Sequence, residues 1–487
     1  PSSSTSHRPS CPGVPTRSRT GRAVRRPDRS SDHRSPDGDA TGSQTESLGE
    51  VLAWLDRHIN LEAIERGSAG RAAQPTLERI AALVGAMGDP ERAFPIVHVT
   101  GTNGKTSTAR LCTALLAAQG LSVGTYTSPH LVALNERIAW NGEPIADADL
   151  LEVLSPLSAL EDFVRAANPG MLAPTWFELL TAAAYRFFGD VAIDAGVVEV
   201  GLGGRYDATN VADGDVAVVT NVELDHVSIL GGTRSEIAWE KAGIVKPGCV
   251  AVVGDEDDEI VDVFSDEARR VGAAEFWRRG VEFECVGNSV AFGGRVVALR
   301  TPGANYEELF LPLYGAHQGE NAAVALAAAE AFFGSALDPA VVAEAFANAR
   351  VPGRLEILAR QPLVVLDGAH NPAGAAALGA ALADDFAVVE RVVVVFGCLN
   401  GRSPVEVLAG LGTERIAHVV ACTPPSLRGL PASEVAAAAR SLGLAASVAD
   451  SVPEALDAAR ALVTEHDLVL VTGSLYLVGA ARSHLTS

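Results

Sequence analysis

The chain has 487 residues, of which 48% are hydrophobic and 20% charged, and its formal net charge is −22. This length is enough for two or three domains with ample core. The composition is that of a soluble globular protein, no apolar run is long enough to span a membrane, and the acidic balance argues against nucleic acid or an anionic membrane as a partner.

Cysteine and lysine are both used sparingly. The cysteines are scattered through apolar segments and none form a C-x-x-C pair, which predicts buried thiols in a reducing cytoplasm, without disulfides or a cysteine zinc site. Their positions are Cys11, Cys112, Cys249, Cys285, Cys398 and Cys422. The only lysines are Lys105, Lys241 and Lys246 among many arginines, so we expect the chemistry to need an amine at the first two, which lie in motifs.

Residues 1–45 are rich in Ser, Pro, Arg and Gly and contain almost no large apolar residues. Such a segment cannot bury enough surface to become ordered, so we predict a disordered tail and assign it no function. Arg25 and Arg26 would suit an export signal, but no apolar segment follows them, and secretion is not expected. A mis-assigned start site and a disordered extension both explain this segment.

From residue 46 the pattern becomes helical, with Val51, Leu52 and Leu55 on one face. A second helix is predicted near 77–87. Only the residues between 46 and 94 therefore precede the first strand, which is too few for a separate large domain.

An apolar run at 94–100 leads into a glycine-containing loop, and an alanine- and leucine-rich helical segment follows as far as Gly120. Strand, loop and helix in this order are typical of a phosphate-binding loop, in which backbone N–H groups and a lysine hold the phosphates. The strict G-x-x-x-x-G-K-[ST] pattern fails because its first position is Val99, and the alternative is a chance Gly-Lys-Thr turn. The predicted ATP-binding residues are Gly101, Thr102, Asn103, Gly104, Lys105 and Thr106.

Strands and helices alternate after this loop. Apolar runs at 123–127, 192–200, 216–222 and 249–254 have the character of buried parallel strands, with helices between them. A turn at 141–142, a helix opening at 175–178, a short antiparallel excursion over 282–313 and helices near 320–333 and 339–349 complete the prediction. The pattern indicates an α/β fold with a mostly parallel sheet.

Residues 351–354 look like a linker, and four further apolar runs follow it at 363–366, 392–395, 418–421 and 468–471. We therefore predict a disordered tail over 1–45, a nucleotide-binding domain over 46–350, and a smaller Rossmann-like α/β domain over 354–487. Ligands are expected in the cleft between the two domains, at the carboxyl ends of strands.

Oxygen and nitrogen donors follow several strands of the first domain. They lie in the phosphate loop and in the segments 128–130, 199–210 and 221–226. Donors from adjacent strand ends are what a Mg²⁺ ion that bridges nucleotide phosphates requires. The glycines at 201, 203 and 204 lack the spacing of a dinucleotide fingerprint, so that interpretation is rejected.

Four motifs together resemble the folylpolyglutamate synthase / dihydrofolate synthase family of the ATP-dependent Mur ligases. They are Thr-Gly-Thr-Asn-Gly-Lys-Thr at 100–106, Ser-Pro-His-Leu at 128–131, the glycine-rich motif at 199–210 and Asp-Gly-Ala-His-Asn-Pro at 367–372. The resemblance runs from about residue 47 to the C-terminus. The first motif indicates the wider group, and the second and third narrow it to the folate branch.

The resemblance implies roles for matching positions. The family's Mg²⁺ ligands correspond to Ser128, Glu199 and His226, and its carbamylated lysine corresponds to Lys241. A carbamate would replace an ammonium that repels Mg²⁺ with an anionic oxygen donor. The family's ATP contacts correspond to Asn321, Arg354 and Asp367. Its second-domain residues that face the reaction centre correspond to His370 and Ser474, and its pterin-binding region corresponds to Thr175, Phe177, Asp207 and Asn210. Lys241, His370, Asp367 and Ser474 are the catalytic residues on this basis.

The chain departs from the family at 397–404, so the contacts of that loop, including those to the incoming amino acid, cannot be carried over. The expected reaction joins L-glutamate to a folate or dihydropteroate carboxylate through an acyl phosphate, in a cytoplasmic monomer. A cell-wall Mur ligase is disfavoured by the short segment before the loop. The motifs also leave open a related ligase acting on another carboxylate and a nucleotide-binding regulator without turnover. The intact Glu199, His226 and Lys241 argue against the regulator.

Overall fold

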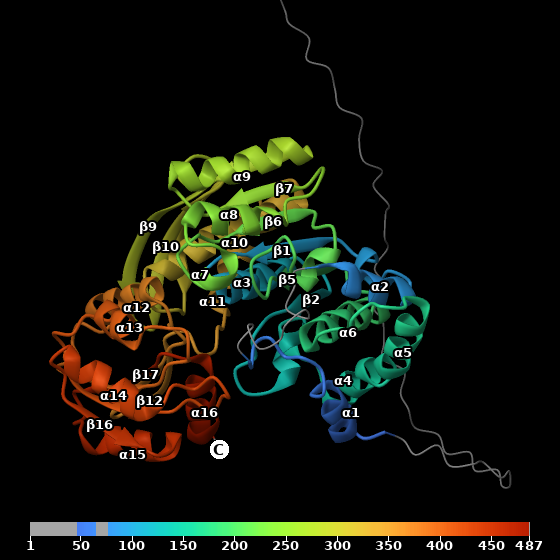
Figure 1. Ribbon diagram of the computed structural model, residues 1–487. Helices are drawn as coiled ribbons and strands as arrows, with labels where there is room; N and C mark the ends of the chain where they lie inside the picture. The colour runs from blue at the N-terminus through green and yellow to red at the C-terminus, as the bar shows by residue number, and fades with distance from the viewer. Residues whose placement is uncertain (1–45, 65–75, 487) are drawn as a thin grey trace, which may run out of the picture. The chain divides into compact units, whose positions relative to one another are not determined.

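The computed structural model describes residues 46–64 and 76–486, and these form three sheets with helices around them (Figure 1). The predicted tail at 1–45, with Cys11, lies outside the described residues. The first sheet has the strand order β4-β3-β2-β5-β1-β6-β7-β8. Its strands are β1 Ile96–Thr100, β2 Val123–Tyr126, β3 Ile138–Trp140, β4 Glu143–Pro144, β5 Ala195–Glu199, β6 Val216–Val219, β7 Val250–Val253 and β8 Glu275–Arg278.

This sheet is parallel from β2 to β8 and becomes antiparallel only at β3 and β4. The predicted turn at Asn141 and Gly142 joins these two short strands, and both residues have positive φ (53° and 85°). That geometry belongs to the tight hairpin turns that Asn-Gly favours.

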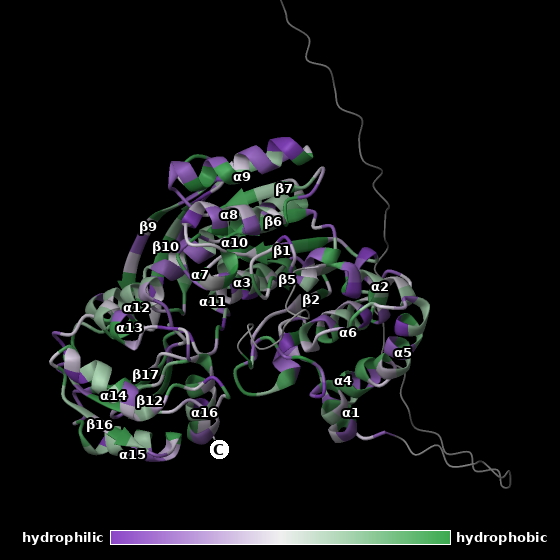
Figure 2. Cartoon of the chain, in the orientation of Figure 1, coloured by the Kyte–Doolittle hydropathy of each residue, from purple (hydrophilic) through white to green (hydrophobic). Residues whose placement is uncertain are grey.

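Helices cover both faces of the first sheet, because successive residues of each strand point to opposite sides. Val97 and Val99 of β1 pack with α3, α10 and α11 on one face, whereas Ile96 packs with α2, α4 and α6 on the other. The latter face continues under α8 and α9, which bury Val219 and Val253. Figure 2 shows the apolar colouring of the central strands.

The helices and 3₁₀ turns of this region follow. They are α1 Leu48–Leu55, α2 Glu78–Ala86, η2 Pro90–Arg92, α3 Lys105–Ala118, η3 Leu134–Arg137, α4 Asp147–Leu154, α5 Leu157–Ala167, α6 Trp176–Asp190, η4 Ala208–Val211, α7 Val227–Leu230, α8 Arg234–Ala242, α9 Asp258–Val271, α10 His317–Phe333 and α11 Pro339–Ala347. The predicted antiparallel excursion is a three-stranded sheet of β9 Glu284–Ala291, β10 Gly294–Arg300 and β11 Asn305–Leu311.

The third sheet belongs to the C-terminal α/β domain, which is coloured orange to red in Figure 1. Its strand order is β12-β13-β17-β14-β15-β16, and β12 alone among these described strands is antiparallel. The strands are β12 Glu356–Arg360, β13 Leu363–Leu366, β14 Val392–Phe396, β15 Ile416–Cys422, β16 Ala446–Ala449 and β17 Leu468–Thr472. The helices are α12 Pro372–Asp384, α13 Pro404–Gly410, α14 Ala432–Ser441, α15 Val452–Ala461 and α16 Leu475–Thr486.

Alternation along β14 again separates two cores. Val392, Val394 and Phe396 face α12, α13 and α14, while Val393 and Val395 face α15 and α16. The fold class is therefore the predicted one, an α/β protein with a large, mostly parallel sheet and a second C-terminal α/β domain. The predicted boundaries at 350 and 354 stay predictions, since the chain from Glu46 onward forms one compact unit.

Candidate active site

The loop between β1 and α3 has the backbone shape of a phosphate cradle. Gly104 is the N-cap of α3 and is left-handed (φ 82°), and within the described structure no side chain caps this helix start. A Cβ at Gly104 would lie 2.3 Å from Asn321 Oδ1, and one at Gly101 would lie 1.8 Å from Thr220 Oγ1. Glycine is therefore required at both positions, and the N–H groups of the first helical turn are open to an anion.

The end of β6 holds this loop in place. Thr220 Oγ1 donates to the carbonyl of Asn103 at 2.6 Å, and the Asn103 N–H donates to Asn221 Oδ1 at 2.9 Å. The hydroxyl of Thr102 donates to the carbonyl of Glu223 at 3.1 Å and accepts from its N–H at 2.9 Å. The loop is thereby fixed before any ligand binds, so a phosphate would meet a preorganised set of donors.

Three of the predicted motifs meet at Glu199. Thr106 Oγ1 lies 3.0 Å from each carboxylate oxygen of Glu199, and the Ser128 N–H donates to Oε2 at 3.3 Å. Glu199 ends β5 and is 1% exposed. Burial raises its pKa, and the positive charge of Lys105 and the hydrogen bond from Thr106 oppose that rise. A buried carboxylate thus lies at the first turn of α3, beside two hydroxyl-bearing residues.

The two motif lysines converge on one carbonyl oxygen. Lys241 Nζ donates to the carbonyl of Gly101 at 2.8 Å, and Lys105 Nζ donates to the same oxygen at 3.1 Å and to that of Thr102 at 3.1 Å. Burial lowers the pKa of Lys241 far below its ordinary value, and the charge of Lys105 lowers it further. Both effects disfavour the charged form of Lys241.

His226 contacts a different set of residues from those that contact Glu199. It is the left-handed N-cap of α7 (φ 50°), and its Nε2 lies 3.4 Å from Arg402 Nη2. Throughout the described ranges no three His, Cys, Asp or Glu side chains are grouped to hold a metal. Around Glu199 itself, the side chains that could hold Mg²⁺ are its carboxylate and the hydroxyls of Thr106 and Ser128. That donor set fits an ion which completes its shell with phosphate and water.

The predicted residues of the C-terminal domain lie on two adjacent loops. Asp367 accepts from the N–H groups of Leu355 at 2.9 Å and Ala369 at 2.8 Å, so part of its work is to shape the loop. His370 Nδ1 lies 2.7 Å from the carbonyl of Gly368, which makes Nδ1 the donor and leaves Nε2 to face Asp225 Oδ2 at 3.8 Å.

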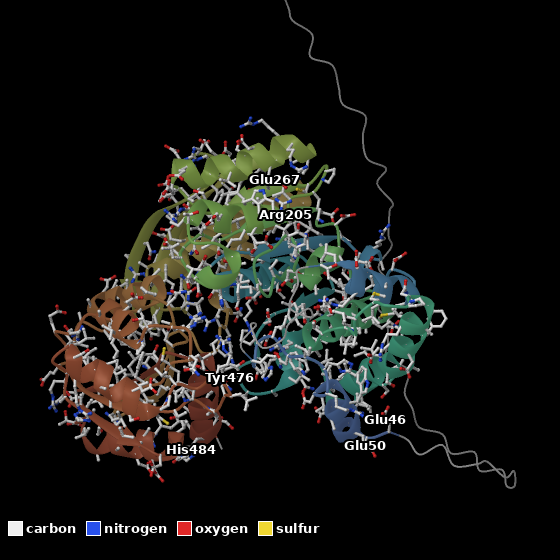
Figure 3. All side chains as sticks on the ribbon, in the orientation of Figure 1. Glu46, Glu50, Arg205, Glu267, Tyr476 and His484 are labelled. Atoms are coloured by element: carbon white, nitrogen blue, oxygen red, sulfur yellow. The ribbon has the colours of Figure 1, made fainter. Side chains whose placement is uncertain are left out.

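Ser474 and Arg354 flank that loop. Ser474 Oγ accepts from the N–H of Tyr476 at 3.2 Å, and Tyr476 is labelled in Figure 3. Arg354 donates to the carbonyl of Gly353 at 3.2 Å. Its charge opposes the pKa rise of Glu199, as the charge of Lys105 does.

Three residues to which the sequence assigned no role join the phosphate loop to the C-terminal domain, and they are Asn371, Asp225 and Arg402. Asn371 Nδ2 donates to Asn103 Oδ1 at 3.0 Å and to Asp225 Oδ2 at 3.2 Å. Arg402 Nη1 donates to the carbonyl of His370 at 2.6 Å, and Nη2 lies 3.6 Å from Asp225 Oδ1. Asn371 belongs to a motif already noted, and Arg402 to the divergent loop, but neither signal indicated this contact.

The predicted pterin residues also have structural partners. Thr175 caps α6 through Glu178 and adjoins a cavity of about 320 Å³, and the Phe177 ring lies 6.0 Å from that of Tyr126. Asp207 accepts from the Thr209 hydroxyl at 2.6 Å. Asn210 Nδ2 donates to the carbonyls of Arg205 at 3.0 Å and Gly243 at 3.1 Å.

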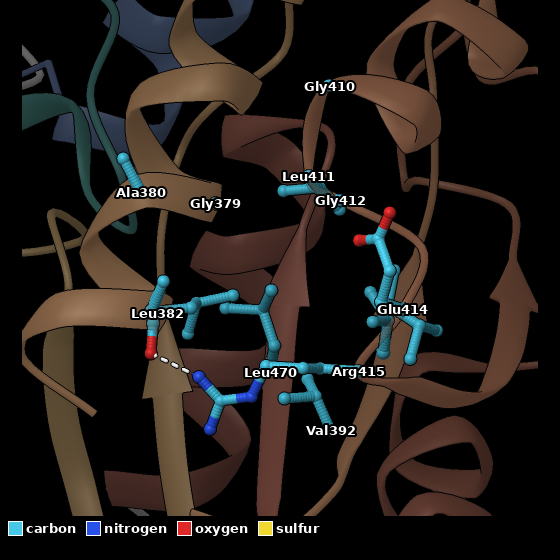
Figure 4. A pocket seen from close by; sticks show the side chains of 13 residues that line it. Gly379, Ala380, Leu382, Val392, Gly410, Leu411, Gly412, Glu414, Arg415 and Leu470 are labelled. Carbon is cyan, nitrogen blue, oxygen red and sulfur yellow. Dashed lines mark hydrogen bonds between the residues drawn. The ribbon is translucent and has the colours of Figure 1, made fainter. Parts of the chain in front are cut away.

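A second cavity, of about 260 Å³, lies in the C-terminal domain (Figure 4). It is lined mainly by apolar side chains such as Leu382, Val394 and Leu470, and none of the predicted site residues line it. Arg415 at its edge donates to the carbonyl of Leu382 at 2.7 Å, near the end of α12.

Comparison with known proteins gives the same assignment as the motifs. Residues 180–329 match the Mur ligase middle domain, and residues 353–475 match the Mur ligase glutamate ligase domain. Dihydrofolate synthase/folylpolyglutamate synthase of Mycobacterium tuberculosis is 39% identical over 440 residues, covering 84% of this chain and 90% of that protein.

Solved structures agree. Folylpolyglutamate synthase of M. tuberculosis complexed with ADP and AMPPCP superposes with a TM-score of 0.84 at 36% identity, covering 90% of this chain and 98% of that one. E. coli FolC in complex with DHPP and ADP gives a TM-score of 0.78 at 32% identity, covering 92% and 99%. The chain therefore belongs to the dihydrofolate synthase/folylpolyglutamate synthase family, a branch of the ATP-dependent Mur ligases.

Proposed function

We propose that this enzyme uses ATP to join L-glutamate to the carboxylate of a folate or of dihydropteroate. The substrate carboxylate takes the γ-phosphoryl group to become an acyl phosphate, and the glutamate amine then displaces phosphate. The names of the relatives support both activities, and the solved relatives were complexed with ADP, AMPPCP or DHPP. The observation that carries the proposal is the contact of Glu199 with Thr106 at the phosphate loop. The Gly101 carbonyl of the same loop accepts hydrogen bonds from both Lys105 and Lys241.

Binding of ATP is assigned to the loop and the residues around it. The N–H groups from Gly101 to Thr106 and the Lys105 ammonium would hold the phosphates. Asn321 lies against Gly104, and Arg354 and Asp367 lie on the facing loops of the C-terminal domain. Fixed donors of this kind stabilise the charge that develops during phosphoryl transfer.

Mg²⁺ is assigned to Ser128, Glu199, His226 and Lys241, of which the first two contact each other. When bound, the ion would neutralise phosphate charge and orient the transferred group. The protein's part is to limit the pKa rise that burial causes at Glu199, which Lys105 and Thr106 do through a positive charge and a hydrogen bond.

Lys241 is assigned as a carbamate. A neutral amine can attack CO₂, forming an N–C bond and releasing a proton to solvent, and the lowered pKa of Lys241 favours the neutral form that this step needs. The product is an anion next to the cationic Lys105, where an ammonium would be repelled. The carbamate would add the oxygen donor that the group around Glu199 lacks.

The remaining steps are assigned to the C-terminal domain and the pterin region. His370 and Ser474 would orient the incoming glutamate, and closure of the loops around Asp225 would exclude water from the acyl phosphate. Thr175, Phe177, Asp207 and Asn210 would hold the pterin.

We further propose that the enzyme works as a cytoplasmic monomer. The cysteines that the structure describes are unpaired, and burial raises the pKa of the Cys112 thiol to about 12. Among the described helices, none is long and apolar enough to cross a membrane. Light scattering of the purified protein tests the oligomeric state.

One observation keeps a second candidate in view, a ligase of the same chemistry with another carboxylate substrate. The divergent loop brings Arg402 against Asp225 and the carbonyl of His370, where the amino acid would bind. A different set of contacts at that place could select a different acceptor or donor.

The test is direct. Purified enzyme is incubated with Mg²⁺, ATP and L-glutamate, with dihydropteroate and tetrahydrofolate in separate reactions, and products are identified by mass. A glutamylated product that needs both ATP and glutamate is expected from at least one pterin. If neither pterin is glutamylated while ATP is still bound, the folate assignment is wrong and the second candidate is favoured.

A further inference from the structure

A buried histidine lies behind the predicted pterin region and has no part in the reaction described above. His98 is on β1, is 0% exposed, and its Nε2 lies 2.9 Å from Thr209 Oγ1. Thr209 is also 0% exposed, and its hydroxyl donates to Asp207 Oδ1 at 2.6 Å. The three side chains therefore form one hydrogen-bonded chain from the central strand to the carboxylate.

The direction of this chain follows from proton counting. The Thr209 hydroxyl has one hydrogen, which it donates in the hydrogen bond to Asp207. The oxygen of Thr209 must therefore accept the hydrogen bond from His98. His98 is therefore the tautomer protonated on Nε2. Its Nδ1 is a bare acceptor with no hydrogen-bond partner among the described residues. Burial lowers the pKa of His98 to about 3, and the charge of Lys246 acts in the same direction, so the ring stays neutral.

A histidine is an expensive way to fill this position. The unpaired Nδ1 loses its hydration without a replacement, whereas an apolar side chain on a buried strand would lose nothing. What the ring contributes is a single donor, and that donor determines which way the Thr209 hydroxyl points. The Tyr185 hydroxyl holds the backbone of the same residue by donating to the Thr209 carbonyl at 2.7 Å.

The Asp207 carboxylate is held in a fixed orientation, and part of its hydrogen-bond acceptor capacity remains free. Asp207 Oδ1 also accepts from the Thr209 N–H at 3.0 Å, and Oδ2 accepts from the Leu202 N–H at 2.9 Å. Asp207 is 7% exposed, so it keeps a small opening while both oxygens are held in place. Oδ1 already accepts two hydrogen bonds and Oδ2 accepts one, so the carboxylate keeps one acceptor site, on Oδ2, for an N–H donor such as the amino group or ring N–H of a pterin.

We propose that His98 is a positioning residue which, through Thr209, fixes the Asp207 carboxylate to accept an N–H group of the pterin ring. This inference rests on the proposed function, because it concerns how that site recognises its acceptor substrate. It makes His98 and Thr209 determinants of pterin affinity without contact to ATP or glutamate.

The test compares two variants that remove a hydrogen-bonding group with two variants that keep one at the same place. Thr209→Val keeps shape and removes the hydroxyl, and His98→Leu removes the donor. Thr209→Ser restores the hydroxyl, and His98→Gln restores an N–H near the position of Nε2. Thr209→Val and His98→Leu should each raise the KM and Kd for dihydropteroate about tenfold or more, which is the effect of losing one buried hydrogen bond to a charged group. The KM for ATP should stay within about twofold of wild type. The second pair should stay within about threefold of wild type.

Thr113→Val is the matched control. Thr113 is buried on α3, and its hydroxyl bonds to Thr125 at 2.7 Å and to the carbonyl of Ala109 at 2.9 Å, away from Asp207. It should cost stability without changing the pterin constants. Thermal melting of every variant shows whether it is folded at the assay temperature.

Two readouts separate this inference from the proposed function. Fluorescence titration with dihydropteroate alone reports binding, and product mass reports ligation. Wild type that binds dihydropteroate but forms no product would contradict the proposed function and leave the binding comparison to judge His98. The inference is overturned if Thr209→Val binds as wild type does, if Thr209→Ser is as weak as Thr209→Val, if ATP and pterin constants rise together, or if wild type binds no pterin.

Discussion

At the scale of single residues, the Gly101 carbonyl is where the chemistry of the site is most constrained. Two lysine side chains donate to this one oxygen, in a chain with only three lysines. Two ammonium groups within hydrogen-bonding distance of the same oxygen repel each other, and burial makes the charged form of Lys241 costly. Burial lowers the pKa of Lys105 as well, but the nearby carboxylates of Glu199 and Asp225 favour its charged form, so a positive charge is less costly on Lys105 than on Lys241.

Replacing Lys241 tests this directly. Lys241→Ala should lower ligation about 100-fold or more, because it removes the oxygen donor that the proposed carbamate would supply, and a small added carboxylate should restore part of the activity. ¹³C NMR of enzyme equilibrated with labelled CO₂ should show a carbamate signal that Lys241→Arg loses and Lys246→Arg keeps. Full activity in Lys241→Ala, or a signal that survives Lys241→Arg, would contradict the carbamate role.

At the scale of elements, α3 begins where a side chain cannot fit. Gly104 has φ 82° and Asn321 lies directly over it, whereas Gly120, just beyond the other end of α3, has φ 87° and open space around it. The two glycines have the same backbone conformation and differ only in what a Cβ would touch.

Alanine at each glycine separates strain from obstruction. Both Gly104→Ala and Gly120→Ala should cost about 1–2 kcal/mol of stability, from a left-handed non-glycine residue. Only Gly104→Ala should also raise the KM for ATP, about tenfold or more, because its Cβ displaces Asn321 and the N–H groups of the cradle. Melting curves and ATP titrations measure the two effects, and equal ATP constants in both variants would show that the loop tolerates the change.

The entry to β17 supplies a pH-dependent element. The hydrogen bond from Arg391 and those from Thr464 lower the pKa of Asp467 to about 2, and burial opposes them. A carboxylate with a lowered folded-state pKa contributes stability above its unfolded pKa, and loses it as the pH falls through the folded value.

Asp467→Asn should therefore melt a few degrees below wild type at neutral pH, and the difference should shrink between about pH 4 and pH 2. Melting temperatures across that range measure it. Asp450→Asn, in a polar turn of the same domain, serves as the matched change of charge. A difference that stays constant with pH would exclude the ion pair as its cause.

At the scale of the whole molecule, Asn371 couples the two α/β regions. Its Oδ1 caps α12 by accepting from the Gly374 N–H at 2.7 Å, while its Nδ2 reaches Asn103 in the phosphate loop and Asp225 after β6. A single amide thus links the nucleotide loop to the helix start beside His370. Such a link can report the state of one loop to the other.

Asn371→Asp breaks the link and keeps the cap, because Asp is as good an N-cap as Asn. The new carboxylate would lie beside Asp225 and Asn103 Oδ1 with no donor, so we expect product formation to fall about tenfold or more, and phosphate release per product to rise. Ser451→Asp at the N-cap of α15 is the control for added charge. Unchanged coupling of ATP use to ligation in Asn371→Asp would show that the bridge is incidental.

Much of the fold could be predicted because its signals are local. The buried strands β1, β5, β6, β13, β14 and β17 are continuous apolar runs, and the turn at Asn141 is a two-residue preference. β8, β12 and β16 were missed. They are edge strands with half-exposed residues, so they lack the apolar run that marks a central strand.

By itself, the sequence determined which residues follow which strands, and parallel pairing then brought Thr106, Ser128 and Glu199 together. Only the tertiary structure decided that His226 contacts Arg402 rather than Glu199, that Asn371 bonds to Asn103 across 268 residues, and that His98 bonds to Thr209 across 111. The reason is physical: strand and helix patterns are set by neighbours in sequence, whereas a hydrogen bond between distant loops depends on how whole sheets pack.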